Sequence, residues 1–430
     1  MKASQASPTS QAHMDREAQY GAHNYHPLPV VLSRGKGARV WDVDGKEYFD
    51  FLSAYSAVNQ GHGHPKITQA LHEQADQLAL TSRAFYNDQL GIYEEKITQL
   101  LGYDKVLPMN SGAEAVETAI KLARRWAYDV KGIPAQHAKI VVVENNFHGR
   151  TTTIVSFSSD PDSYAGFGPY AEGFVRIPYN DLDALKAALK DPHVAAFLAE
   201  PIQGEAGVVL PDSSYWAGVR AACTEAGVLM LADEVQTGMG RTGAWLSSCG
   251  TCTCTSSCER QAEYIRPDIL ILGKALSGGL YPVSAVLADD EVMLTIHPGQ
   301  HGSTFGGNPL ASRIAIAALD VLLEEGLLEN TRRRGAQFRQ GMESLQERFA
   351  ILGLVRGRGL LNAVELNDSP EGSAAWEICM AMAQEGVLAK PTHGNIIRFA
   401  PPLVITETEM QEALERIARA LRTWETTPQG

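Results

Sequence analysis

The stretch ILILGKALSGGLYP, residues 269–282, carries the strongest single signal for fold and chemistry in this chain of 430 residues. Four apolar residues in a row, Ile269–Leu272, predict a short buried strand. Lys274 follows that strand closely, and burial disfavours the charged form of an amine. A neutral lysine amine is a nucleophile suited to Schiff-base chemistry with carbonyl compounds. A surface lysine that only begins a helix is the alternative interpretation.

A second apolar run, residues 228–232, also ends in charge, at Asp233 and Glu234. Parallel strands bring their carboxyl ends to one edge of a sheet, and open α/β sheets bind ligands at that edge. We therefore expect Lys274 and Asp233 to lie in one site. The pairing of a cation with an anion makes the surface-lysine interpretation much less favourable.

The composition describes a globular chain without a nucleic-acid or anionic-membrane partner. Its 37 Lys and Arg residues face 50 Asp and Glu residues, so the formal net charge is −13, and a negative surface repels phosphate-rich partners. No apolar run reaches the roughly 18 residues that span a bilayer. The N-terminal MKASQASPTSQAH lacks an apolar signal core. We expect a disordered tail on a cytoplasmic protein, with a mitochondrial matrix protein as the alternative.

Helical and strand patterns alternate through the middle of the chain. An apolar helical stripe runs from Ala113 to Trp126. Buried-strand patterns cover residues 140–143, 195–199, 228–232 and 269–272. This alternation predicts an α/β fold in which a large domain, residues 57–305, has a mainly parallel sheet covered by helices.

The two ends of the chain have a different character. Asp44-Gly45 indicates a tight hairpin between two short strands. Residues 306–430 are helix-rich and end in an amphipathic helix, which Thr406 and Glu409 would cap. We expect a smaller α+β domain from this C-terminal part, with residues 1–56 packed against it.

Three segments offer groups for a phosphate or a ring. Ser111, Gly112 and Ala113 open the predicted helix, where free N–H groups and the positive end of the dipole favour an anion. A plain helix cap is the alternative for these residues. Residues 302–309 form a second glycine-rich turn with two hydroxyls. Phe147, after the strand that ends near residue 143, suits either packing or stacking on a cofactor ring.

Together these residues resemble the class III (ornithine aminotransferase-like) subgroup of pyridoxal-phosphate enzymes, from about residue 20 to about residue 424. The motifs that carry the resemblance are YGAHNYHPLPV, DFLSAYSAVNQGHGHPKI, NSGAEAVETAIKLAR, EPIQGEAGVVLP, ADEVQTGMGRTG, LGKALSGGLYPVSAV, HGSTFGGNPL and AKPTHGNIIRFAPPLVI. The resemblance implies fold type I, bound pyridoxal 5'-phosphate and a homodimer with shared active sites. It also implies transfer of the δ-amino group of L-ornithine to 2-oxoglutarate through pyridoxal and pyridoxamine forms of the cofactor.

The resemblance assigns cofactor roles to particular residues. Lys274 would hold the cofactor covalently and later move a proton, and Asp233 would pair with the pyridinium nitrogen. The remaining cofactor contacts would come from Gln236 at the phenolic oxygen, Phe147 on the ring with His148 beside it, and Ser111, Gly112 and Ala113 at the phosphate. Thr304, with Ser303 beside it, would reach the phosphate in the partner subunit's site.

Five further residues would select the substrate. Arg150 would bind the distal α-carboxylate of ornithine, and Tyr25 and Tyr55 would contact the same end. Arg398 would bind the α-carboxylate of 2-oxoglutarate, and Glu205 would pair with Arg398 while ornithine is bound. An ordinary ion pair is the alternative for Glu205 and Arg398, and core packing is the alternative for the tyrosines.

The sequence departs from the subgroup in two places. Cys249, Cys252, Cys254 and Cys258 lie in an insertion of about a dozen residues, which suits a surface loop, a redox-active cluster or, less well, a metal site. His148 stands where close relatives often carry Trp. The functional alternatives are an aminotransferase for acetylornithine or 4-aminobutyrate, an aminomutase, and a non-enzymatic sensor built on the cysteines.

Overall fold

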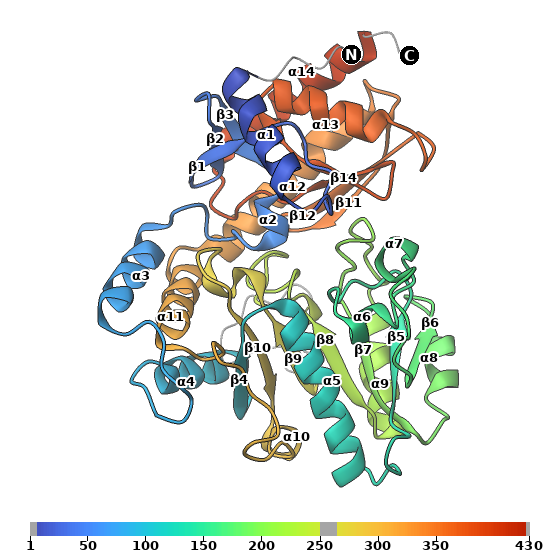
Figure 1. Cartoon of the computed structure of the whole chain (residues 1–430). Helices are drawn as coiled ribbons and strands as arrows, with labels where there is room; N and C mark the ends of the chain where they lie inside the picture. Colours follow the sequence, from blue (N-terminus) through green and yellow to red (C-terminus); the bar gives the residue numbers. More distant parts are fainter. Residues whose placement is uncertain (1–6, 250–264, 427–430) are drawn as a thin grey trace.

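The computed structural model describes residues 7–249 and 265–426. The lower part in Figure 1 is built around a seven-stranded sheet, and the upper part holds two four-stranded sheets. Helix α2 (Ser53–Ser56) lies where the two parts meet.

The large sheet has the strand order β4-β10-β9-β8-β7-β5-β6. Its strands are β4 (Lys105–Met109), β5 (Lys139–Val143), β6 (Phe174–Ile177), β7 (Val194–Ala199), β8 (Leu229–Asp233), β9 (Ile269–Leu272) and β10 (Ser284–Ala288). Neighbours from β9 to β6 pair in parallel, whereas β10 runs antiparallel to β4 and β9. The predicted mainly parallel sheet is confirmed, and the four predicted strands appear as β5, β7, β8 and β9.

Helices cover both faces of this sheet. They are α3 (Pro65–Gln77), α4 (Leu90–Leu101), α5 (Gly112–Asp129), α6 (Thr152–Val155), α7 (Pro161–Tyr164), α8 (Leu182–Ala188), α9 (Tyr215–Ala226), α10 (Asp290–Met293) and α11 (Pro309–Glu324). Along β5, Ile140 and Val142 pack in the core with α5, while Val141 and Val143 pack in the core with α9. Successive strand side chains point to opposite faces, so a continuously apolar strand needs helices on both.

The upper part joins the two ends of the chain. Its strands are β1 (Leu32–Lys36), β2 (Arg39–Asp42), β3 (Glu47–Asp50), β11 (Leu352–Arg358), β12 (Leu361–Leu366), β13 (Val387–Leu388), β14 (Lys390–Thr392) and β15 (Ile396–Phe399), and its helices are α1 (Pro8–Tyr20), α12 (Leu327–Gln346), α13 (Ala374–Gln384) and α14 (Glu407–Thr426). The predicted hairpin is confirmed as β2–β3. Strand β13 pairs in parallel with β3. Helix α11 packs against α3 and α4 of the lower part, and the division at residue 305 stays a prediction.

Polar residues near the N-terminus cap a helix instead of forming the expected disordered tail. That expectation is wrong for residues 8–13, which belong to α1. The Ser7 hydroxyl accepts the Ser10 N–H at 3.0 Å and donates to Asp44 at 2.6 Å. Pro8 at the first helical position has a backbone angle already suited to a helix.

The last helix has the predicted start. The Thr406 N–H donates to the Glu409 carboxylate at 3.0 Å, and the Glu409 N–H donates to the Thr406 hydroxyl at 3.3 Å. The capping box is therefore confirmed. Across residues 7–249 and 265–426, no helix has both the length and the apolar character to cross a membrane.

Candidate active site

Lys274 begins a short 3₁₀ helix, Lys274–Ser277, directly after β9 and Gly273. Its φ of 45° lies in the left-handed region, which costs a non-glycine residue about 1–2 kcal/mol. Burial lowers the pKa of the Lys274 amine and outweighs the opposing charges of Asp233 and Glu205. Within the described part of the chain this amine makes no hydrogen bond or salt bridge. It is therefore a reactive group without a protein partner.

Asp233 ends β8, the strand beside β9. Asp233 pairs with Ile271, so its carboxylate and Lys274 lie at the same edge of the sheet, as predicted. One carboxylate oxygen accepts the Val235 N–H at 3.0 Å, and the other lies 2.6 Å from Nδ1 of His148. The side chains of His148 and Asp233 are only 0% and 5% exposed, so this contact is shielded from water.

Glu200 directly follows β7 and is buried close to the same edge. Its carboxylate accepts the backbone N–H groups of Phe147 at 3.0 Å and Gly204 at 3.3 Å. Burial, reinforced by the charge of Asp233 and opposed by His148, raises the pKa of Glu200 to about 7. Glu200 is missing from the predicted site, although the same strand-end signal that marks Asp233 marks it too.

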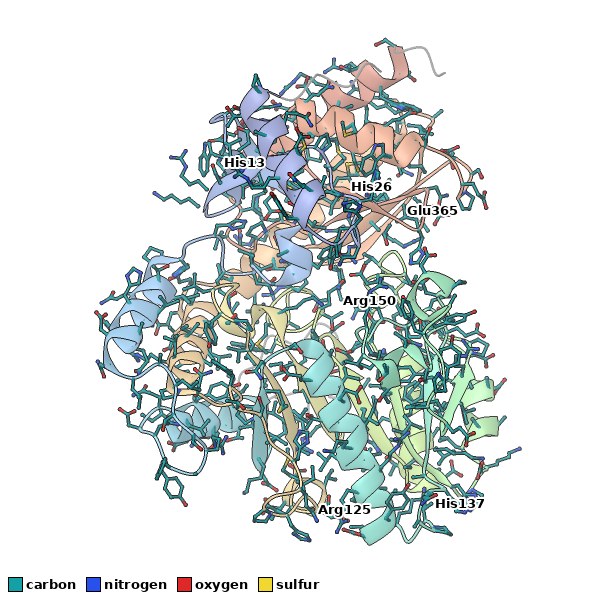
Figure 2. The ribbon with its side chains drawn as sticks, viewed as in Figure 1. His13, His26, Arg125, His137, Arg150 and Glu365 are labelled. Carbon is teal, nitrogen blue, oxygen red and sulfur yellow. The ribbon has the colours of Figure 1, made fainter. Side chains whose placement is uncertain are left out.

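All five predicted substrate residues line one cavity of about 770 Å³. The residues are Tyr25, Tyr55, Arg150, Glu205 and Arg398. Figure 2 places Arg150 at the boundary between the upper and lower parts, with His26, another residue of the cavity wall, on the upper side. Lys390 and Thr392 of β14 complete part of the wall and are additions to the predicted set. The cavity thus draws its lining from segments far apart in the sequence.

A buried ion pair lies at the inner end of this set. Glu205 Oε1 is 3.0 Å from Arg398 Nη1, and the two side chains are 25% and 2% exposed. Gln236 bridges the pair, because its amide nitrogen donates to Glu205 at 3.2 Å and its amide oxygen accepts from Arg398 at 3.4 Å. Burial alone would raise the pKa of Glu205, but the charge and hydrogen bond of Arg398 outweigh it and lower that pKa.

The aromatic residues differ in their surroundings. The Arg398 guanidinium lies 4.9 Å from the centre of the Tyr55 ring. Burial, and the charge of Glu205, raise the pKa of Tyr55, so its phenol stays protonated. Tyr25 is 74% exposed, which rules out core packing for it. Arg150 lies 5.7 Å from the centre of the Phe147 ring, so the predicted substrate and cofactor residues adjoin.

The start of α5 provides an anion site. Ser111 and Glu114 form a capping box, in which the Glu114 N–H donates to the Ser111 hydroxyl at 3.2 Å and the Ser111 N–H donates to the Glu114 carboxylate at 2.7 Å. The N–H groups of Gly112 and Ala113 find no acceptor in the described part of the chain. Free N–H groups at the positive end of a helix favour a phosphate.

The second glycine-rich turn lies against this helix start. The Ser303 hydroxyl accepts hydrogen bonds from the Asn110 amide at 2.8 Å and from the Gly306 N–H at 3.0 Å. Thr304 is exposed and does not line the cavity of its own protomer. The structure therefore brings Ser303 close to Ser111 and leaves Thr304 on the surface.

The chemistry of these groups fits one small molecule. A phosphate would meet the N–H groups of Gly112 and Ala113, an aldehyde would meet the Lys274 amine, and a protonated ring nitrogen would meet Asp233. Pyridoxal 5'-phosphate carries all three groups, so the fold and site define a pyridoxal-phosphate-dependent enzyme of fold type I. Residues 20–421 match the family model for Aminotransferase class-III, and the chain belongs to this family of transaminases.

Comparison with known proteins narrows the relationship. The chain is 58% identical over 420 residues to a mitochondrial ornithine aminotransferase of Rattus norvegicus, covering 98% of this chain and 92% of the rat protein. The ornithine aminotransferase structure from Toxoplasma gondii ME49 matches with a TM-score of 0.92 at 46% identity, over 97% of this chain and 96% of that one. An acetylornithine aminotransferase structure from Elizabethkingia anophelis matches with a TM-score of 0.86 at 54% identity, over 96% and 99%.

The cysteine-rich insertion lies largely beyond the described residues. Cys252, Cys254 and Cys258 fall in the gap, and the side chain of Cys249 is not described either. The three predicted alternatives for these cysteines therefore stay predictions. Elsewhere, in residues 7–249 and 265–426, no group of three or more His, Cys, Asp or Glu side chains is arranged to hold a metal.

Proposed function

We propose that this transaminase moves the δ-amino group of L-ornithine to 2-oxoglutarate. The products are L-glutamate and glutamate 5-semialdehyde, which cyclises to pyrroline-5-carboxylate. The observation that carries this assignment is the Glu205–Arg398 pair in a cavity that also holds Arg150. Such a site accepts a substrate with a cationic reacting end in one half-reaction and a dicarboxylate in the other. The 58% identity to the rat ornithine aminotransferase supports the same substrate.

The cofactor residues act through positions described above. When bound, pyridoxal 5'-phosphate supplies an electrophilic aldehyde carbon and an electron-withdrawing ring. Lys274 binds the aldehyde and later carries a proton on Nζ between the substrate carbon and the cofactor. Asp233 keeps the ring nitrogen protonated, since a buried carboxylate favours a neighbouring cation.

Other side chains hold the cofactor in place. Gln236 donates to the phenolic oxygen and Phe147 stacks on the ring, with His148 next to it. The phosphate lies on the N–H groups of Gly112 and Ala113 and on Ser111. These contacts orient the ring and exclude water from its reacting face.

The substrate residues separate the two half-reactions. Arg150 binds the α-carboxylate of ornithine in bidentate geometry, and Tyr25 and Tyr55 contact the same distal end. Glu205 neutralises Arg398 while the δ-amine reacts. In the second half-reaction Arg398 leaves Glu205 and binds the α-carboxylate of 2-oxoglutarate.

We also propose a homodimer with shared sites. Phe85, Tyr86 and Phe305 are 69%, 105% and 47% exposed, and exposed large apolar groups often mark an interface. The turn that carries Phe305 and Thr304 adjoins this segment, because the Leu310 N–H donates to the Ala79 carbonyl at 3.4 Å. A second copy covering this surface would receive Thr304 at its phosphate.

The dimer is tested by sedimentation of the full-length protein. The wild type should sediment at twice the chain mass of 46.6 kDa. Tyr86→Asp should give a monomer that binds the cofactor weakly. A wild type that sediments as a monomer with full activity contradicts the shared site.

A specific observation favours a second candidate substrate. The Elizabethkingia anophelis structure, 54% identical to this chain, is named an acetylornithine aminotransferase. Single-turnover reactions with ornithine, N-acetylornithine and 4-aminobutyrate, followed by the cofactor absorbance, decide between them. Ornithine should react fastest, and a preference for N-acetylornithine would overturn the assignment. An aminomutase would sustain turnover without 2-oxoglutarate, so the same assay with and without this acceptor tests that alternative.

For the compartment, we propose the cytoplasm or the mitochondrial matrix. The rat relative is named mitochondrial, which favours the matrix over the cytoplasm that we expected first. Imaging of the tagged full-length protein in its own cells, with a matrix marker beside it, distinguishes the two.

A further inference from the structure

His148 is buried against the Asp233 carboxylate, and nothing derived above gives its imidazole a task. Its Nδ1 lies 2.6 Å from Asp233 Oδ2, and its side chain is fully shielded from solvent. We propose that His148 is a positioning residue, which holds the Asp233 carboxylate in the orientation needed at the ring nitrogen of the cofactor. This inference rests on the proposed role of Asp233.

The direction of the hydrogen bond follows from its partners. An ionised carboxylate can only accept, so the proton of this bond belongs to Nδ1 of His148. Burial disfavours the imidazolium, but the hydrogen bond to Asp233 and the charges of Asp233 and Glu200 outweigh burial and raise the pKa of His148. The imidazole therefore remains a donor to Asp233 at neutral pH.

Two donors fix the plane of the carboxylate. His148 holds Oδ2, and the Val235 N–H holds Oδ1 at 3.0 Å. Asp233 itself belongs to β8, a central strand of the sheet. Each carboxylate oxygen has a second lone pair, so the ring N–H can still bind. Without His148 the side chain would lose one donor and could rotate away.

Glu200 supplies a second charge beside the imidazole. The charged groups that act on His148 are Asp233 at the end of β8 and Glu200 after β7. Glu200 also anchors the segment that carries His148, because it accepts the Phe147 N–H. A single proton shared between Glu200 and His148 leaves the three groups with the same net negative charge whichever of the two holds it. That constant charge favours a protonated ring nitrogen.

Packing alone is the competing explanation for His148. Its ring lies 6.0 Å from the ring of Phe157, so it also contributes to the core. Two variants separate the explanations. His148→Asn keeps a donor close to the position of Nδ1 but has a smaller side chain. His148→Leu keeps roughly the same volume but has no donor.

The test uses full-length holoenzyme loaded with pyridoxal 5'-phosphate labelled with nitrogen-15 in the ring. The ring-nitrogen chemical shift reports its protonation, and equilibrium titration gives the cofactor dissociation constant. His148→Leu should raise that constant by roughly 10- to 100-fold, since an orphaned charged acceptor is lost as a fixed partner. It should also move the ring signal toward that of an unprotonated pyridine. His148→Asn should keep the ring signal and weaken binding by less than about tenfold.

Each outcome decides the question. If Asn and Leu have equal effects, or if Leu behaves as wild type, the positioning role is wrong. If Asn alone is impaired and unfolds at lower urea concentration, packing is the correct explanation. Asp233→Ala serves as the matched control: should it leave affinity and ring signal unchanged, the proposed role of Asp233 fails as well. A severe effect of Asp233→Ala beside a normal His148→Leu removes only the present inference.

Discussion

Replacing Glu205 by Gln should change which half-reaction the enzyme prefers. Glu205 Oε1 lies 3.0 Å from Arg398 Nη1, and Arg398 is only 2% exposed. Loss of the carboxylate leaves a buried guanidinium without its counter-charge while ornithine reacts. The ornithine half-reaction should slow, whereas glutamate, whose α-carboxylate needs Arg398, should react at least as fast as before.

The geometry sets the size of this effect. At 3.0 Å and an effective dielectric constant of about 20, the attraction is about 5 kcal/mol, which is an upper bound. Glu205 is 25% exposed, so water replaces part of it, and charged hydrogen bonds of this kind contribute about 1.5–3 kcal/mol. The ratio of kcat/KM for ornithine to kcat/KM for glutamate should therefore fall by about 10- to 100-fold.

The assay follows each half-reaction separately by stopped-flow absorbance of the cofactor. Glu205→Asp is the matched control, because it keeps the charge and should shift the ratio much less than Gln does. An equal loss in both half-reactions, or a ratio that rises, would refute the switch and leave Glu205–Arg398 as an ordinary structural ion pair.

Three more predictions address other groups in the site. Lys274→Ala should abolish turnover and remove the absorbance of covalently held cofactor; normal multiple turnover would disprove the assignment of this lysine. Arg398→Ala should impair reaction with 2-oxoglutarate far more than reaction with ornithine, and comparable losses measured in single turnovers would argue against its role. Because the pKa of Glu200 is raised to about 7, the native state binds more protons than the unfolded chain between about pH 4.5 and 7, so this group's contribution to stability falls as pH rises through that window. Glu200→Gln should remove a loss on the order of 3 kcal/mol in urea unfolding measured at about pH 5 and 8, and an unchanged pH dependence would contradict it.

Local patterns were sufficient for much of the fold and for the central pair of site residues. The runs that became β8 and β9 are apolar throughout, because both sheet faces are covered by helices. Their ends therefore marked Asp233 and Lys274. The hairpin at Asp44-Gly45 and the capping box at Thr406 depend on neighbouring residues only, which makes them visible in the sequence.

Other features depend on contacts that no local pattern records. The apolar run of β10 does not reveal its antiparallel direction, since strand direction follows from how the chain returns to the sheet. The His148–Asp233 bond joins residues 85 positions apart. Residues 53–56 all have positive φ without containing a glycine, so the usual composition signal for such a backbone is absent.

The pairing of β3 with β13 has a consequence for synthesis of the chain. Phe49 lies opposite Val387 in this sheet, so one edge of the first hairpin waits uncovered until almost the whole polypeptide has left the ribosome. Contacts of such long range form late, and an open strand edge invites pairing with a neighbouring nascent chain. Truncation before residue 387 should thus yield a protein that aggregates through its beginning, even where its central sheet is complete.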